Sequence, residues 1–231
     1  MKRLALLATA LALSACGSKA DREPAPTPTP TDAQPRTLVA ADLELGTLGA
    51  RIEGPQGDAF ETVLSAGNRE IGKMVSFVAC PAGTEECRPA AMPEGTIYTY
   101  VHRITLDDVD QDIAAAQAAS GPEVIENAPT LFRTTRAASG FNAAVGYSSA
   151  DALKVLGSAD AISITSESGQ LVWRLTEGKW RPGGTLTFWW QSTKAPTGPA
   201  DAYLLEIEGN QAVARGPFPG NEKPVDDNRR R

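Results

Sequence analysis

The sequence predicts a mainly β fold, an antiparallel β-sandwich with one or two short helices. Many short segments alternate apolar residues with polar or small ones, which is the period of a strand in a sheet with one buried face. Turn-forming residues separate these segments at short intervals. Two packed sheets are the architecture that buries the apolar faces of many short strands.

The first half of the domain contains three predicted strand regions. Spaced apolar residues predict a first pair of strands around Gly46, and they are Leu43, Leu45, Leu48 and Ile52. Residues 71–78 and 96–106 are predicted strands, the second rich in β-branched and aromatic residues. One face of the strand at 96–106 carries Tyr98, Tyr100, His102, Ile104 and Leu106.

The second half continues with strands and one clear helix signal. Ser148 and Asp151 have the spacing of a capping box, which predicts a helix of one or two turns ending near Gly157. Ser168-Gly169 and Gly209-Asn210 are expected to form turns. The predicted strands are residues 131–136, 141–147, 162–164, 171–175, 186–190, 203–207 and 212–215.

The domain is expected to span residues 37–215, followed by a flexible tail. Residues 216–231 are polar and contain Pro217, Pro219 and Pro224, which predicts a tail without packed structure. Residues 107–120 place aspartates before an alanine run, and both a short helix and an irregular insertion fit that pattern. About 180 residues between linker and tail suit one domain with a full core.

The four tryptophans cluster between residues 173 and 190. Strand alternation places Trp173 and Trp190 in the core and directs Trp189 toward water, while Trp180 lies in a connection. Exposed flat aromatic rings are suited to sugar binding, because the face of a sugar ring is apolar. Trp180 and Trp189 are therefore the candidate ligand-binding residues. The alternative is that both rings cover a second sheet face or one end of the sandwich.

Three aspartates could form the start of a calcium loop. Asp108, Asp110 and Asp112 have the opening spacing of an EF-hand, but that loop needs Gly at position six and Glu at position twelve. Ile113 and Ala119 occupy those positions. A looser calcium site and a solvated, helix-capping cluster both remain open, and we assign no metal ligand.

Catalytic motifs are absent from the sequence, and no catalytic residue is assigned. His102 could act as a general base, although a histidine between aromatic residues in a strand is more often packed and hydrogen-bonded. There is no Gly-x-Ser-x-Gly elbow, phosphate loop or dinucleotide fingerprint. We expect a non-enzymatic protein without a cofactor, and an envelope hydrolase is one alternative.

The N-terminus has the features of an export signal. Lys2 and Arg3 precede an apolar run of about ten residues, too short to span a bilayer, which needs roughly 20. The tetrapeptide Leu13-Ser14-Ala15-Cys16 resembles the lipobox of bacterial lipoproteins. The resemblance implies that residues 1–15 are a signal peptide and that Cys16 carries lipid. Gly17 after the cysteine implies the outer membrane by the rule of that family.

A proline- and threonine-rich linker follows the anchor over residues 16–36. With no apolar residue larger than alanine, it is expected to act as an extended spacer of up to roughly 60 Å. Removing residues 1–15 takes away Lys2 and Arg3 and leaves 20 basic against 28 acidic residues. That acidic balance argues against a general nucleic-acid binder.

The remaining cysteines, Cys80 and Cys87, flank a loop-like segment. Disulfides persist in exported proteins, so we expect a bridge between them. A metal pair is the alternative, although zinc would need unusual ligands because His102 is the single histidine.

These features together predict an envelope lipoprotein with a non-catalytic binding or structural β-domain. The segment 187–192 resembles bacterial surface proteins that pair one β-domain with varied anchors, a likeness that brings no activity. The expected partners are the membrane, through lipid on Cys16, and an envelope protein or a glycan. A carbohydrate-binding module using Trp180 and Trp189 is a further alternative.

Overall fold

A computed structural model describes residues 34–54, 57–108, 128–207 and 210–220. These residues belong to one compact unit, Asp32–Arg231. Six expectations lie wholly or partly outside them: the signal peptide, Cys16, the linker up to residue 33, most of the 107–120 segment, Gly209, and residues 221–231 of the expected tail. Within the described part, no helix has both the length and the apolar character needed to cross a membrane.

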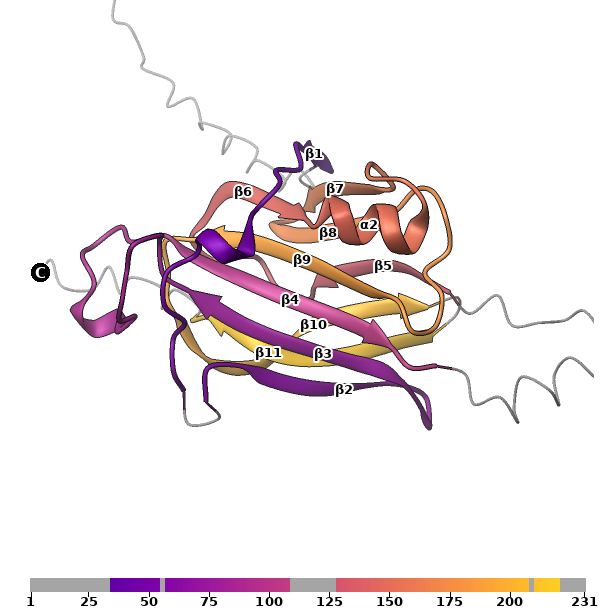
Figure 1. Cartoon of the computed structure of the whole chain (residues 1–231), viewed down its shortest axis with the longest axis horizontal. Helices are drawn as coiled ribbons and strands as arrows, with labels where there is room; N and C mark the ends of the chain where they lie inside the picture. The colour runs from indigo at the N-terminus through magenta and orange to yellow at the C-terminus, as the bar shows by residue number, and fades with distance from the viewer. Residues whose placement is uncertain (1–33, 55–56, 109–127, 208–209, 221–231) are drawn as a thin grey trace, which may run out of the picture. The chain divides into compact units, whose positions relative to one another are not determined.

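The described residues form two packed antiparallel sheets, which confirms the predicted mainly β sandwich (Figure 1). Sheet A has six strands in the order β1-β7-β8-β5-β10-β11, and sheet B has five in the order β2-β3-β4-β9-β6. The strands are β1 Arg36–Leu38, β2 Phe60–Ala66, β3 Arg69–Ala79, β4 Tyr98–Leu106, β5 Pro129–Thr134, β6 Phe141–Tyr147, β7 Ile162–Glu167, β8 Gln170–Leu175, β9 Thr185–Ser192, β10 Pro196–Ile207 and β11 Asn210–Pro219.

The core lies between the sheets and is filled by aromatic rings. Alternation placed Tyr100 and His102 on one face of β4, and the structure makes this the inner face, where both are fully buried. Phe132 of β5 sits among the rings of Trp173, Phe188 and Tyr203, with centroid distances of 5.4, 4.9 and 5.8 Å. Burial of large aromatic side chains dominates the energy of such a core.

The local signals for the turn and the helix are also confirmed. Ser168 and Gly169 both adopt positive φ angles, of 50° and 80°, which match the twist of the β7–β8 hairpin. Helix α2, Ser149–Leu156, begins after Ser148, whose hydroxyl accepts a hydrogen bond from the Asp151 backbone N–H at 3.1 Å. It ends at Gly157 in the left-handed conformation.

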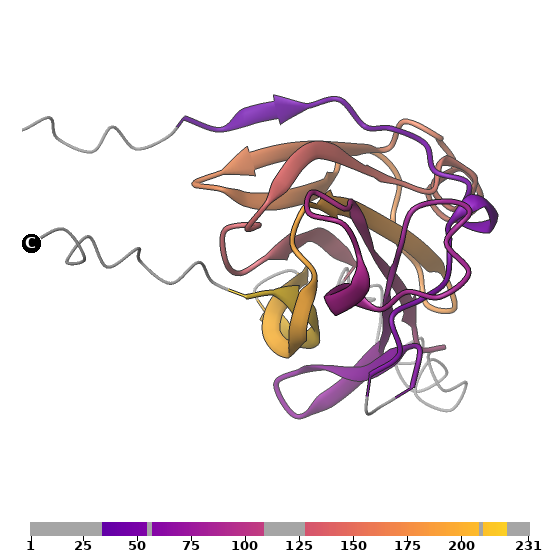
Figure 2. The ribbon, with the colours of Figure 1, turned by 90° about the vertical axis from the view of Figure 1, so that its left-hand side faces the viewer.

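The prediction of a first pair of strands around Gly46 is wrong. Leu45–Thr47 form the short 3-10 helix η1, and the flanking residues run over the outer face of sheet B (Figure 2). We call residues 39–48 the strap. Its leucines pack onto apolar side chains of the sheet, whereas its backbone makes one isolated bridge to the sheet, at Ala41, and forms no strand.

The predicted end of the domain at residue 215 is also wrong, because β11 continues to Pro219. Phe218 is 1% exposed and contacts the rings of Trp190 and Tyr203. The Tyr203 hydroxyl donates to the Pro217 carbonyl at 2.8 Å. Proline is tolerated here because β11 is the outermost strand of sheet A.

The outer strands of the two sheets are joined on both sides of the sandwich. On one side, the Thr62 hydroxyl on β2 donates to the Arg215 carbonyl on β11 at 2.8 Å. On the other, β1 pairs with β7, and Ala41 then pairs with Gly146 on β6. These contacts protect strand edges that would otherwise offer unpaired backbone groups.

Candidate functional site

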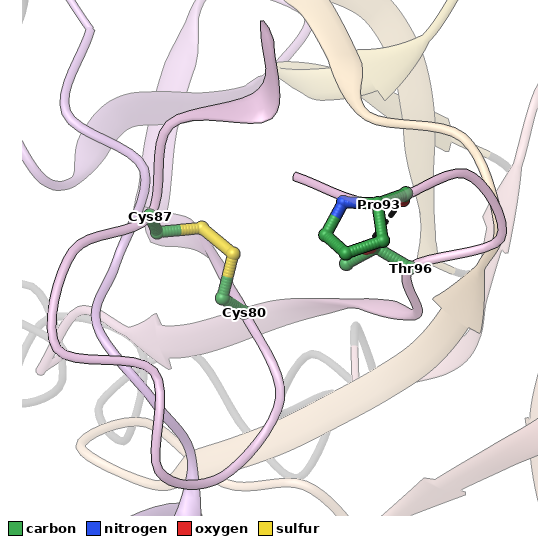
Figure 3. The surroundings of a disulfide bond; sticks show 4 residues. All are labelled: Cys80, Cys87, Pro93 and Thr96. Carbon is green, nitrogen blue, oxygen red and sulfur yellow. Dashed lines mark hydrogen bonds between the residues drawn. A yellow bond between two sulfur atoms is a disulfide. The ribbon is translucent and has the colours of Figure 1, made fainter. Parts of the chain in front are cut away.

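The expected disulfide is present between Cys80 and Cys87, with an S–S distance of 2.01 Å (Figure 3). The loop that it closes holds the chain that follows the strap. The Gly49 N–H donates to the Cys80 carbonyl at 3.1 Å, and the Ala50 N–H donates to the Thr84 carbonyl at 2.8 Å. In the chain-entropy account, a bridge closing so short a loop stabilises the fold by about 2–3 kcal/mol.

Figure 3 also shows the turn that leads from the disulfide loop into β4. The Thr96 hydroxyl donates to the Pro93 carbonyl at 2.7 Å, and the Thr96 N–H donates to the same oxygen. The bridge and this turn together fix the start of the strand that carries His102.

His102 is packed in the core, so it cannot serve as an accessible general base. The ring is fully buried, lies 4.1 Å from the Tyr203 ring between centroids, and has Nδ1 2.9 Å from the Ser76 hydroxyl. Burial lowers the pKa of His102 to about 3. The hypothesis of a hydrolase that uses His102 as its general base is therefore excluded, because the buried imidazole is not accessible to a substrate.

The expected exposure of Trp189 is wrong. The residue does lie on the outer face of sheet B, but it is 3% exposed. The strap covers it, and the cluster around it contains Phe77, Val101, Leu43, Leu45 and Leu48. Alternation placed Trp189 on the correct face of β9. That face is shielded from water by the strap, which is distant in sequence.

The ligand-binding interpretation fails for Trp180 as well, because its side chain is 1% exposed, and burial agrees with the alternative of a covering ring. Its indole N–H donates to the Gly184 carbonyl at 3.0 Å, and its ring lies 6.0 Å from that of Phe188 between centroids. Trp180 anchors the connection between β8 and β9. Buried rings cannot stack on sugars, so the carbohydrate site built on Trp180 and Trp189 is not formed.

The strap supports a testable prediction about stability. Leu48→Asp places a carboxylate against the outer apolar cluster and should lower the free energy of unfolding by about 1–2 kcal/mol. Val39→Asp on the same strap is a matched control, because Val39 is 89% exposed, and it should change stability by less than about 0.5 kcal/mol. Chemical denaturation of both variants checks this, and equal losses would show that the strap does not seal the cluster.

Asp108 is exposed and lies two residues beyond the end of β4, whereas Asp110 and Asp112 lie outside the described residues. Among the described residues, no group of three or more His, Cys, Asp or Glu side chains is placed to hold a metal ion.

One concave site in the described part of the chain is a basic groove of about 930 Å³. It lies between α2, the connection from β8 to β9, and the outer face of β4 and β9. Four cationic side chains line it against the single carboxylate of Asp151, and they are Arg103, Lys154, Lys179 and Arg181. The whole chain is acidic, with a net charge of -6, so this local excess of positive charge stands out.

Close backbone packing shapes the groove. A Cβ on Gly178 would lie 2.3 Å from the Leu156 carbonyl oxygen, and one on Gly184 would lie 2.8 Å from Val155 Cγ1. Glycine at both positions therefore lets the connection approach α2. Sequence reasoning missed this site because its cations come from three separate segments. The sequence did offer one signal, because Lys179 and Arg181 lie on either side of a tryptophan. When that tryptophan is buried, both charged neighbours are left at the surface.

Comparisons with known proteins assign no family to this fold or groove. The chain matches no protein-family model, no curated protein and no solved structure.

Proposed function

We propose that this chain is an exported envelope lipoprotein, with lipid on Cys16 and a non-catalytic β-sandwich that binds a ligand or partner. The observation that carries the proposal is the order of features ending in Leu13-Ser14-Ala15-Cys16. The bridge between Cys80 and Cys87 supports it, because such bonds persist outside the cytoplasm. With those two cysteines paired, Cys16 is the one cysteine left for lipid.

The physical basis of the anchor is the burial of acyl chains. Each buried methylene contributes about 0.8 kcal/mol, and stable attachment takes more than one chain. The linker, which ends before β1 begins at Arg36, would then space the sandwich from the bilayer. Gly17 favours the outer membrane by the resemblance to lipoproteins.

A binding role is favoured over catalysis by the surroundings of His102 and by the basic groove. The imidazole is sealed behind aromatic rings, whereas the groove is open and lined by exposed charged side chains. Cationic side chains in a concave surface recognise ligands without needing a nucleophile or a base.

Metabolic labelling with an alkyne fatty acid tests the anchor. The wild type should incorporate the probe and fractionate with membranes, and Cys16→Ser should lose both properties. Ser14→Ala is a matched control, because it keeps a small residue in the motif and should label as the wild type does. Equal labelling of wild type and Cys16→Ser would refute the lipoprotein assignment.

A further inference from the structure

We infer that the basic groove binds a phosphate-bearing, multiply charged anion, an inference that rests on the proposed binding role of the β-domain. The groove brings four cationic side chains around about 930 Å³, within the size range of sites for small ligands. Phosphate groups on a soluble molecule and on a lipid headgroup share the chemistry that such a site recognises.

Three of the cations that line the groove take part in no ion pair within the described part of the chain. In the described part of the chain, the ion pairs engage other cations, namely Arg51–Asp58, Lys73–Glu61, Arg88–Glu86 and Arg174–Glu167. Arg103, Lys154 and Arg181 take part in none of them. An anion entering the groove therefore meets cations that no described carboxylate already holds.

Two carboxylates lie close to the groove. Asp151 occupies the first turn of α2, where a negative charge is stabilised by the helix dipole. The Asp108 side chain lies at the rim of the groove, next to Gly183 of the connection between β8 and β9. Set against Arg103, Lys154 and Arg181, these two carboxylates still leave positive charge among the described groove residues, which favours an anionic ligand.

One wall of the groove is held in place before any ligand binds. Trp180 is buried between Lys179 and Arg181, so both of these neighbours are directed to the surface. The Leu106 N–H donates to the Gly184 carbonyl at 3.1 Å, and the Gly183 N–H donates to the Leu106 carbonyl at 3.0 Å. A wall fixed in this way reduces the ordering cost of binding.

Phosphate is the favoured ligand group because of the two arginines. A guanidinium donates two parallel hydrogen bonds to phosphate oxygens, and a phosphate group carries more charge than a carboxylate. Arg103 on β4 and Arg181 on the β8–β9 connection come from different elements. A ligand engaging both would therefore span the groove.

Isothermal titration of the full chain with inorganic pyrophosphate tests the inference. The Cys16→Ser background removes any contribution of acyl chains. Saturable binding is expected that weakens as salt is added, because the cations are exposed. The double variant Arg103→Gln/Arg181→Gln should weaken binding by about tenfold or more. Lys154→Gln, on the exposed face of α2, gives a second variant should the double variant fold poorly.

The matched control is Arg69→Gln/Arg215→Gln, which removes the same charge from exposed positions outside the groove. It should change the affinity by less than about twofold. An equal loss in both double variants would mean that net charge, and not the groove, holds the anion. Citrate binding as tightly as pyrophosphate would refute the preference for phosphate.

Vesicles separate the two sources of phosphate. Sedimentation with vesicles that contain phosphatidic acid, whose phosphomonoester carries up to two negative charges, but not with phosphatidylcholine vesicles, would identify a lipid headgroup. Pyrophosphate binding without sedimentation would identify a soluble ligand. Binding to neither refutes the inference and leaves the anchor standing, because fatty-acid labelling at Cys16 does not depend on the groove.

Discussion

Lowering the pH from 8 to 5 is expected to reduce the free energy of unfolding by about 2 kcal/mol through His102. The unfolded imidazole has a pKa of about 6.5, whereas burial lowers the folded pKa to about 3. Below pH 6.5 the unfolded chain therefore binds a proton that the folded chain excludes. Stability is constant above that range and falls by up to about 1.4 kcal/mol per pH unit between the two pKa values.

The loss of stability between pH 8 and pH 5 can be assigned to His102, because it is the single histidine of the chain and carboxylates titrate nearer pH 4. Urea denaturation between pH 8 and pH 5 measures the slope. His102→Gln should be less stable at pH 8 but should show a flat profile over that interval. NMR of the folded protein should show no titration of the ring near neutral pH, and a midpoint near 6.5 would contradict the sealed environment.

Trp173→Ala is expected to cost about 3–5 kcal/mol, which is a large share of the stability of a single domain. The side chain is fully buried, and its ring contacts those of Phe132 and Phe188. Its indole N–H donates to the Gly146 carbonyl on β6 at 3.0 Å, so it also joins the two sheets. Truncation would leave a cavity and remove the hydrogen bond to the Gly146 carbonyl.

Two variants separate these contributions. Trp173→Phe keeps an aromatic ring but loses the hydrogen bond, and it should fall between the wild type and Trp173→Ala. Arg174→Ala, at the next, exposed position, should cost less than about 1 kcal/mol, although Arg174 lies 3.6 Å from Glu167. Thermal and urea denaturation measure all three. A loss below 1 kcal/mol for Trp173→Ala would show that the sheets do not depend on this side chain.

The surroundings of Gly146 show why packing could not be read from the sequence. The Trp173 indole binds its carbonyl, and a Cβ there would meet the Trp189 ring at 2.7 Å and the Ala41 carbonyl oxygen at 1.9 Å. Glycine is required because three distant segments converge on one residue. Its position in an alternating strand carries no signal of that crowding.

Alternation along single strands predicted which side chains share a face of β4 and the core positions of Trp173 and Trp190, because neighbouring residues alone set which side chains share a face. The capping of α2 and the β7–β8 turn were predictable for the same local reason. Exposure was not predictable, since it depends on what covers a face. The strap buries Trp189, the β8–β9 connection buries Trp180, and Phe218 closes the core from a segment that composition alone described as a tail. The basic groove likewise exists only once three separate segments are brought together, because charge density is a property of the folded surface.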